Sequence, residues 1–482
     1  MTHRVDIAII GAGFAGSILA SILARSGCRV ALIDATHHPR FAIGESSTPL
    51  ADMILRRLAN IYQLPHLEAL STWGAWQDQF PDLACGRKRG FSYYQHVRNQ
   101  VFSENHIGQH SLLVAASAND SVADTHWYRQ DVDEFLFREA INQGALDLLG
   151  HAVHEIESEP AGRTIIRCAN QQGQASVSTD WLIDASGAAA VSARLLGQQA
   201  LTETLRTQTR TAFGHYRNVG LWSEQLQQLG QDTQRDPFDT DDAAQHHLVD
   251  DGWVWMLRFN NGITSVGRTE VMGCNPKPIT HDFTDYPSLA RMMTTASFVA
   301  PQQGIQSTGR IQHLFCPVIS RRKLLLPTAA ITLDPLHSTG ISHALAGVDR
   351  ISRILLTGSE HEQLNSIKQY ESTFFEESFL LDHLVSTAYC VMHDFERFTA
   401  ACMIYFAGAI CCEERYQQGQ NPTHLWNAGD PTFVDFAAKA CDTLLDPHGD
   451  YEGLISEGIA PWNTAGLMDR KVANRYAYTA TK

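Results

Sequence analysis

A glycine-rich turn between two apolar segments near the N-terminus places the strongest constraint on the fold. Residues 5–10 read Val-Asp-Ile-Ala-Ile-Ile, a run that suits a strand buried on both faces. The turn Gly11-Ala-Gly13-Phe-Ala-Gly16 follows at once, residues 17–26 carry apolar side chains at helical spacing, and the apolar residues 29–34 come next. This order of strand, turn, helix and strand within about thirty residues predicts a βαβ unit.

The residues of this turn suit a dinucleotide. Gly11 permits a tight bend, Gly13 lets a pyrophosphate approach the backbone, and Gly16 lets the helix lie close to the strand. The helix N-terminus, which includes Ala15, faces the phosphate charge. Asp34 ends the second strand 23 residues after Gly11, where a carboxylate can accept hydrogen bonds from ribose hydroxyls. A glycine turn that binds nothing is the alternative, and the full βαβ context favours the dinucleotide.

Composition and charge exclude several classes of protein. A chain of 482 residues that is 44% hydrophobic and 18% charged is ordinary for a globular enzyme with a large core. The net charge of −15, without a dense Lys/Arg run, disfavours nucleic acid and anionic membranes as partners. The first residues lack the features of a secretory signal, and no uninterrupted apolar run of about eighteen residues occurs, so a cytoplasmic location is expected. The cysteines show no CxxC spacing, and we expect free thiols and no metal site.

In the rest of the chain, segments with strand-like patterns alternate with segments with helical patterns. Helices are expected over 48–80 and 131–143 and after 340, and strands over 90–95, 126–129, 163–168, 180–184 and much of 205–320, around a polar stretch at 224–245. Without repeats or low-complexity linkers, the parts are expected to pack as one interleaved body. We predict four units: 1–205 with inserted strands at about 85–128, 206–320 as a substrate-facing sheet, 321–355 as a return to the first unit, and 356–482 as a helical region.

Five segments, in chain order, resemble motifs of the FAD-dependent monooxygenases and halogenases with a p-hydroxybenzoate-hydroxylase-like fold. They are the GxGxxG turn, Arg40-Phe-Ala-Ile-Gly44-Glu45-Ser46, Arg129-Gln-Asp-Val-Asp133, Asp184-Ala-Ser-Gly187 and Asp334-Pro335. The resemblance covers roughly residues 5–345. It implies an α/β fold in which a Rossmann-like FAD-binding domain is interleaved with a mainly β substrate domain and followed by a C-terminal helical cap.

The same resemblance implies which residues contact FAD. Arg40 and Arg129 can neutralise the pyrophosphate or hold polar flavin atoms, although each could instead be a solvated or ion-paired surface residue. Glu45 is either a ribose contact or a helix-capping acid. The remaining implied contacts are Gly44, Ser46, Asp184, Gly187 and Asp334.

Lys88 is the candidate catalytic residue. Within the superfamily the chain is most similar to the flavin-dependent halogenases, and residues 87–93, Arg-Lys-Arg-Gly-Phe-Ser-Tyr, resemble the strand that carries their catalytic lysine. A regular strand would send Lys88 to the face opposite Phe91 and Tyr93 unless a bulge intervenes. Alternatively, Lys88 is a solvated member of the cationic run 87–89. An acyl-carrier-protein partner would need a basic docking patch, for which residues 87–89 and 321–323 are the candidates.

Two tryptophans form the second halogenase-like feature. The segment 252–258, Gly-Trp-Val-Trp-Met-Leu-Arg, is similar to the family's G-W-x-W-x-I-P motif, which implies that Trp253 and Trp255 close the flavin side to ordinary substrate oxygenation. Residues i and i+2 of a strand share a face, so they could form such a wall, and they could equally be core. Leu257-Arg258 replaces the family's Ile-Pro.

The third feature is the segment from Asp334 to Ile341, which resembles the loop whose backbone amides bind halide. Successive N–H groups of Ser338, Thr339 and Gly340 would form an anion nest without a charged side chain. His337 stands where tryptophan halogenases carry a glutamate, which disfavours tryptophan as substrate. It could act as a general base or donor, or simply hold the structure through hydrogen bonds.

Two further features bear on the family. Residues 326–330 lack the superfamily's "GDA" motif, which implies exchangeable flavin. The helices from Asp394 onward resemble the C-terminal helical cap of halogenases.

The function implied by the resemblance is halogenation of an electron-rich ring. FADH2 from a separate reductase and O2 would oxidise chloride or bromide to hypohalous acid, which would pass Trp253 and Trp255 to Lys88. The acceptor would be a phenol, a pyrrole or a similar aromatic compound, either free or on an acyl carrier protein. Two rivals remain: an aromatic monooxygenase or dehydrogenase that uses no halide, and a flavin-holding protein without turnover.

Overall fold

A six-stranded sheet contains the glycine turn. The computed structural model describes residues 2–159, 162–273 and 279–478. The strand order is β21-β22-β12-β2-β3-β8, in which every neighbouring pair is parallel except β21 with β22. The strands are β2 (Ile7–Ile10), β3 (Val30–Asp34), β8 (Leu146–Leu149), β12 (Trp181–Asp184), β21 (Ile319–Ser320) and β22 (Lys323–Leu325). The predicted βαβ unit is therefore present, and its strands β2 and β3 are fully buried.

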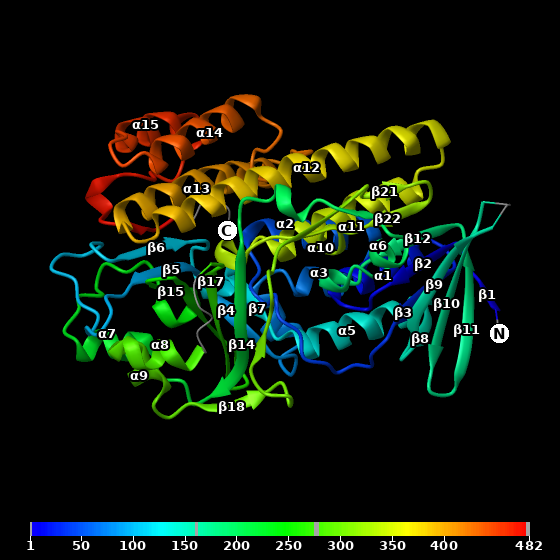
Figure 1. Ribbon diagram of the computed structural model, residues 1–482, viewed down its shortest axis with the longest axis horizontal. Coiled ribbons are helices and arrows are strands. Elements are labelled where there is room, and N and C mark those ends of the chain that lie inside the picture. Colours follow the sequence, from blue (N-terminus) through cyan, green and yellow to red (C-terminus); the bar gives the residue numbers. More distant parts are fainter. Residues whose placement is uncertain (1, 160–161, 274–278, 479–482) are drawn as a thin grey trace.

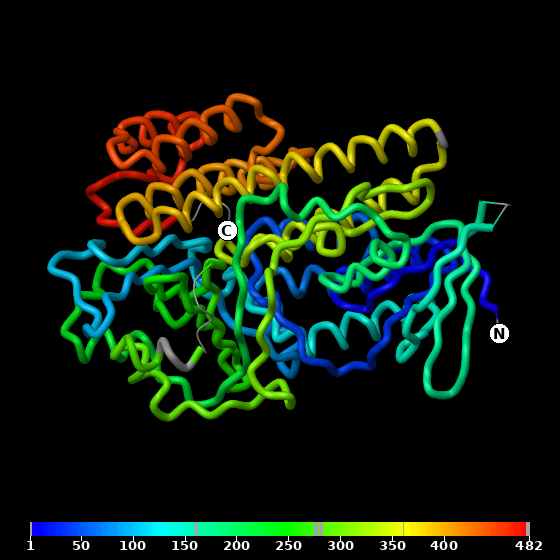
Figure 2. Tube along the Cα trace, in the orientation of Figure 1, coloured from blue at the N-terminus to red at the C-terminus, as the bar shows by residue number. Residues whose placement is uncertain are grey.

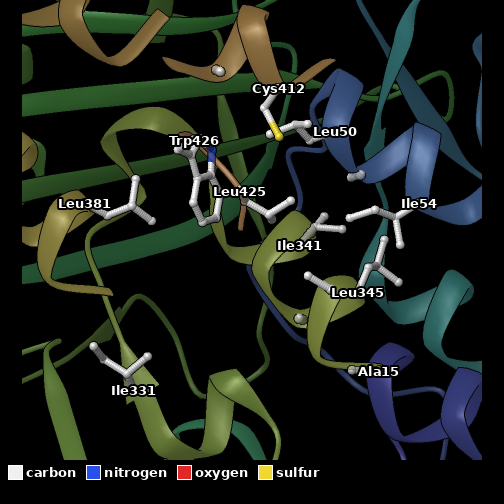
Figure 3. Packing of buried hydrophobic residues seen from close by; sticks show 14 of the residues in the cluster. Ala15, Leu50, Ile54, Ile331, Ile341, Leu345, Leu381, Cys412, Leu425 and Trp426 are labelled. Atoms are coloured by element: carbon white, nitrogen blue, oxygen red, sulfur yellow. The ribbon is translucent and has the colours of Figure 1, made fainter. Parts of the chain in front are cut away.

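Helices cover this sheet and bind it to the later part of the chain. Helix α1 buries ten of its twelve residues and packs against α5 and α11, while α11 also packs against α2. Figure 3 shows Ile341 and Leu345 of α11 near Ile54 of α2, and Cys412 of α13 beside Leu50. The helices of this part are α1 (Phe14–Arg25), α2 (Pro49–Tyr62), α3 (Pro65–Ala69), α4 (Trp73–Gln79), α5 (Arg129–Asn142), α6 (Val191–Leu195), α10 (Pro327–Ala330) and α11 (Gly340–Leu356).

A nine-stranded sheet forms the second half of the molecule. Its order is β18-β14-β17-β16-β15-β5-β6-β24, with β19 paired to β14. The strands are β5 (Gly90–Gln95), β6 (Ser111–Ala115), β14 (Thr209–Arg217), β15 (Ala243–Val249), β16 (Gly252–Arg258), β17 (Ile263–Val271), β18 (Ser297–Ala300), β19 (Gln306–Ser307) and β24 (Arg475–Tyr476). Three short helices accompany them: α7 (Trp222–Gln228), α8 (Ile279–Asp285) and α9 (Pro287–Met293).

Three smaller sheets complete the strands. Figure 2 shows β1 beside the β9–β11 strands at one end of the molecule, where the order is β1-β11-β10-β9. The strands are β1 (Thr2–Arg4), β9 (Ala152–Ser158), β10 (Thr164–Asn170) and β11 (Gly173–Thr179), then β4 (Cys85–Lys88) with β7 (Asp124–Trp127), and finally β13 (Gln199–Ala200), β20 (His313–Cys316) and β23 (Ile331–Thr332).

Long C-terminal helices lie over both halves (Figure 1). They are α12 (Glu360–Val391), α13 (Phe395–Gln417), α14 (Pro431–Leu445) and α15 (Tyr451–Gly458). Helix α13 is long and apolar enough to cross a membrane, but 83% of its apolar window is buried inside the protein. It is therefore a core helix of this fold, because its apolar surface is already covered by protein.

The α/β class, the strand-rich middle and the helical C-terminal region are confirmed. The predicted polar stretch at 224–245 is partly wrong, because its first residues belong to α7, which buries only one face through Trp222, Gln225 and Leu226. Strand β6 falls within the predicted inserted strands at about 85–128, whereas β24 is not predicted; it is only two residues long, and its parallel pairing with β6 joins positions more than 350 residues apart. The four unit boundaries stay a prediction.

Candidate active site

The glycine turn is built for close approach. Gly11 has φ of 106°, and a Cβ there would lie 2.4 Å from the Ala185 carbonyl oxygen. A Cβ on Gly16 would lie 2.0 Å from the Gly11 oxygen, so glycine is needed to let α1 meet β2. Gly13, the N-cap of α1, differs from both, since the nearest atoms to a Cβ there belong to Asp133, Arg129 and Arg40 at 3.6–3.8 Å.

Two arginines, Arg40 and Arg129, lie next to Gly13 at the N-terminus of α1. Arg129 is buried and forms a two-pronged ion pair with Asp133 at 2.7 and 2.8 Å, and it donates to the Ile43 and Gly44 carbonyls. Arg40 pairs with Asp34 at 3.0 Å, and its buried Nε has no hydrogen-bond partner within the described ranges. The alternative of a solvated or ion-paired surface residue is wrong for Arg129, which is buried, whereas Arg40 is ion-paired and partly exposed. An unsatisfied N–H, a helix N-terminus and a glycine without close neighbours together fit an anionic group such as a pyrophosphate.

Asp34 lies at the end of β3, as predicted, and its carboxylate forms hydrogen bonds within the protein. It accepts hydrogen bonds from the Ala12 N–H (2.9 Å) and from Thr36 and Arg40. Asp184 likewise accepts from the Ser186 and Ser192 N–H groups, which holds the turn that packs against Gly11. Ribose or flavin contacts by these two residues, and by Ala15 and Gly187, stay predictions.

The segment after Gly44 connects the nucleotide side to the second half. Glu45 is buried and its Oε1 lies 2.8 Å from His215 Nε2, so it is not a helix cap. Ser338 Oγ donates to Ser46 Oγ at 3.1 Å. The carbonyl of the next residue, Ser47, accepts from Lys88 Nζ at 2.6 Å. Two consecutive residues therefore contact the predicted halide loop and the predicted catalytic lysine.

Lys88 is fully buried, which excludes the solvated alternative. Its Nζ lies 3.9 Å from the centroid of the Phe91 ring. The expectation that Lys88 and Phe91 point apart is wrong, because β4 ends at Lys88 and pairs with β7, while β5 begins at Gly90 in another sheet. The alternation is broken at residue 89. Buried Asp124 stands directly opposite Lys88 in the β4–β7 pairing, so the two charges share a face.

The proposed docking patch at 87–89 is also wrong. Arg87 forms ion pairs with Asp120 and Asp242 at 2.6 Å each. Arg89 pairs with Asp120 at 2.7 Å and is mostly buried. With Lys88 buried, the cationic run offers no free basic surface.

The two tryptophans share one face of β16, as predicted, with ring centroids 5.9 Å apart. Trp253 Nε1 donates to the Tyr389 hydroxyl at 2.7 Å, and that hydroxyl donates to Asp334 at 3.0 Å. Trp255 Nε1 donates to Ser265. The hydroxyl of Tyr389 therefore connects Trp253 to Asp334 through two successive hydrogen bonds.

The departure from the family's Ile-Pro has a structural use. Arg258 pairs with Asp241 at 2.7 Å and donates to the Val219 and Gly220 carbonyls. It therefore fixes the loop before α7 to the end of β16.

The loop 334–340 is held from several sides. Asp334 accepts from Thr209 Oγ1 at 2.6 Å and from the Leu336 N–H at 3.1 Å. Ser338 has φ of 54°, and α11 begins at Gly340. The first N–H groups of a helix have no partner within it, and a left-handed residue just before them turns successive N–H groups toward one side. The Ser338 N–H, however, donates to the Pro335 carbonyl at 2.9 Å, so the predicted anion nest is wrong for this N–H group. Halide binding by the backbone of Thr339 and Gly340 stays a prediction.

His337 is packed rather than exposed. Its ring stacks on Tyr405, with centroids 4.2 Å apart and planes 9° from parallel, and the Tyr405 hydroxyl donates to the His337 carbonyl. Burial, with a smaller contribution from His246, lowers the pKa of His337 to about 3. The ring is therefore neutral at pH 7 and is a poor base there, which favours the structural alternative.

Asp334 should make stability depend on pH. Burial raises its pKa to about 6 from 3.8. The folded protein then keeps a proton that the unfolded chain has released, so stability from this group is complete below about pH 3.8 and is lost as the pH rises to about 6. The loss is on the order of 3 kcal/mol. Asparagine does not titrate, so Asp334→Asn should not lose this stability. Between about pH 3.8 and pH 6, its melting temperature without flavin should therefore rise relative to that of the wild type. Parallel melting curves would contradict this.

Sequence reasoning missed the residues that hold the site together. Ser47, Thr209, Tyr389 and Tyr405 contact the predicted residues, and the last two come from α12 and α13. Aromatic residues at helical spacing signal core packing, and no local pattern separates these two from their neighbours.

Comparisons with known proteins agree with this geometry. A family model described as NAD(P)-binding Rossmann-like domain matches residues 9–70, and one described as tryptophan halogenase matches residues 88–398. Tetracycline 7-halogenase of Kitasatospora aureofaciens is 28% identical over 365 residues, which is 72% of this chain and 62% of that protein. Monodechloroaminopyrrolnitrin halogenase PrnC of Pseudomonas fluorescens is 25% identical over 86% of this chain and 73% of its own.

Among solved structures, halogenase PltM in complex with phloroglucinol and FAD superimposes with a TM-score of 0.86. It is 23% identical, and the match covers 98% of this chain and 99% of that one. The chondrochloren halogenase CndH superimposes with a TM-score of 0.62 at 16% identity. At these identities the structures establish the shared fold.

Proposed function

Because the chain belongs to the tryptophan halogenase family, we propose that it is a flavin-dependent halogenase acting on an electron-rich aromatic ring. The observation that carries this proposal is the environment of Lys88. A fully buried lysine over Phe91 is held by Ser47, and the adjacent Ser46 contacts the loop at Ser338. A buried ammonium is costly and is retained where its charge is used.

The residues present fit FAD. The N-terminus of α1 at Gly13, with Arg40 and Arg129 beside it, would hold the pyrophosphate, and Asp34 and Glu45 would contact the ribose. Reduced FAD, supplied by a separate reductase, would provide with O2 the two-electron oxidation of chloride or bromide. The missing "GDA" supports an exchangeable cofactor.

The chain's own residues would control the oxidised halogen. The backbone N–H groups of Thr339 and Gly340 would bind the halide, and Trp253 and Trp255 would exclude the organic substrate from that side. Lys88 would hold hypohalous acid through a hydrogen bond or carry the halogen as a haloamine, and so direct it to one ring position.

A small aromatic compound is the proposed substrate. PltM is described in complex with phloroglucinol, a phenol, and this supports a phenol or a similarly electron-rich ring for the present chain. The histidine at position 337, where tryptophan halogenases carry a glutamate, argues against tryptophan as the substrate. A substrate on an acyl carrier protein would need another basic surface, for which the exposed Arg321 and Arg322 are candidates. A cytoplasmic enzyme fits the burial of α13.

The test is a bromination assay. Purified protein, FAD, a flavin reductase, NADH and bromide are incubated with a panel of phenols, pyrroles and indoles, and products are examined for the bromine isotope pattern. We expect a brominated phenol or pyrrole whose yield depends on bromide. Hydroxylated product formed equally without halide would instead indicate a monooxygenase, and bound FAD without O2 consumption would indicate a binding protein.

A further inference from the structure

An apolar pocket lies next to Lys88. The space in it that the centre of a water molecule can occupy is about 20 Å³, so the pocket is narrow and a bound ring would need some of its side chains to move apart. Its lining comes from the start of α2, from β5 and β6, from one face of α13 and from Tyr478 near the C-terminal end. The residues are Thr48, Pro49, Phe91, Val114, Ala115, Ala116, Tyr405, Phe406, Ala409, Ile410, Glu413 and Tyr478.

The lining connects this pocket to the chemistry on two sides. Phe91 carries the Lys88 ammonium over its ring, and Thr48 directly follows Ser47, whose carbonyl binds that ammonium. Tyr405 stacks on His337 in the loop 334–340. A ring in this pocket would therefore contact Phe91, whose ring also contacts the lysine that is proposed to deliver the halogen.

Thr48 has a hydroxyl that the fold does not use. It is the N-cap of α2, where threonine normally accepts a hydrogen bond from the first turn and contributes about 1 kcal/mol, yet it makes no such bond. Its Oγ1 is buried, and no partner for it exists among residues 2–159, 162–273 and 279–478. An unsatisfied buried hydroxyl costs stability, so a ligand that bonds to it is the simplest explanation.

Glu413 adds a carboxylate to an otherwise apolar helix face. Residues 405, 406, 409, 410 and 413 follow helical spacing and line the pocket together. Glu413 is only 5% exposed, and a glutamate is almost never fully buried unless it is paired, so its carboxylate is already engaged within the protein. A carboxylate has about four acceptor sites, so it can accept a ligand hydroxyl in addition to contacts within the protein.

We propose that Thr48 and Glu413 recognise the hydroxyl group of a phenolic substrate, and that Glu413 takes its proton during halogenation. This inference rests on the proposed function and narrows it to phenols. A ring that loses its phenolic proton becomes a far stronger nucleophile, and a positioned base of this kind contributes about 10²–10⁴-fold. Thr48 acts by hydrogen bonding alone.

The step balances as follows. Glu413 takes the phenolic proton, a ring carbon bonds to the halogen, and the bond between halogen and oxygen in hypohalous acid breaks. The ring is oxidised by two electrons and the halogen is reduced. The hydroxide released takes a proton from Lys88 and becomes water. The halogenated carbon then loses its hydrogen as a proton to Lys88, and Glu413 returns its proton to the substrate oxygen.

The test compares Glu413→Gln with Glu414→Gln, the next residue on α13, which bonds Thr464 at the surface. For bromination of phenol at pH 7, kcat/KM should fall about 100-fold in Glu413→Gln and stay unchanged in Glu414→Gln. The loss should shrink as the pH approaches the phenol pKa of about 10, because solution then supplies phenolate. Glu413→Asp should keep the wild-type pH profile at a lower rate. An unchanged profile in Glu413→Gln would overturn the inference while leaving the proposed function intact.

Binding gives a second readout that needs no turnover. By calorimetry without flavin, phloroglucinol should bind about 10-fold more weakly to Thr48→Val and to Glu413→Gln than to wild type, a loss of about 1.4 kcal/mol. Thr48→Ser and Glu414→Gln should bind normally. Equal affinity in Thr48→Val and wild type would reject this pocket as the hydroxyl site even if Glu413→Gln fails to fold.

Discussion

Lys88→Met is expected to lower kcat/KM for bromination by at least about 1,000-fold while O2 consumption from supplied reduced FAD continues. Methionine fills a similar buried volume over Phe91, but it cannot donate to the Ser47 carbonyl, bind hypohalous acid or carry a halogen. The loss corresponds to about 4 kcal/mol of transition-state stabilisation. Brominated product is measured by mass spectrometry, and O2 uptake and released hydrogen peroxide are measured in parallel.

Stability must be separated from activity in this experiment. Asp124 stays buried opposite the substituted residue, and a buried charge without its counter-charge costs roughly 3–5 kcal/mol. The double variant Lys88→Met/Asp124→Asn should therefore recover thermal stability and remain inactive. Arg87→Met removes a charge from the same strand outside the site and should keep its rate. Bromination by the double variant would refute the role of Lys88.

The N-terminal part of the fold could be predicted because its signals are local. Gly11, Gly13, Gly16 and Asp34 lie within 24 residues of one another, and each position has its own steric or polar requirement. The apolar runs on either side are short, continuous and fully buried, as a parallel sheet requires.

The surroundings of Lys88 could not be predicted from residues 87–93. One regular strand would separate Lys88 from Phe91, and only the division of the segment between two sheets brings them together. Likewise, Arg87 and Arg89 look like free cations in sequence because their partners Asp120 and Asp242 are more than thirty residues away. Pairing between segments that are distant in sequence decides whether residues 87–89 are buried, and the local sequence pattern does not indicate that pairing.

The C-terminal contribution was hidden for a different reason. The aromatic spacing of α13 is that of an ordinary buried helix, and most of its residues do pack in the core. One signal was present, since Glu413 interrupts the apolar face formed by residues 405, 406, 409 and 410. A single acid on an apolar face is detectable in sequence, but Thr48, which lines the same pocket, becomes apparent only once α2 and α13 are placed together.

Gly13→Ala is expected to weaken FAD binding by roughly 1,000-fold without unfolding the protein. Gly13 has φ of −72° and ψ of 179°, which alanine adopts freely, and an added Cβ meets no atom closer than 3.6 Å. The methyl group would instead occupy the space through which a pyrophosphate approaches the N-terminus of α1. Losing two charge-assisted hydrogen bonds at about 1.5–3 kcal/mol each gives an effect of this size. Titration of FAD, followed by flavin fluorescence, measures it.

Two other glycines separate ligand binding from folding. A Cβ on Gly16 would lie 2.0 Å from the Gly11 oxygen, so Gly16→Ala should lower the melting temperature even without flavin. Gly309, exposed and without near neighbours, should tolerate alanine in both assays. If Gly13→Ala bound FAD as tightly as the Gly309→Ala control, the pyrophosphate would have to lie elsewhere.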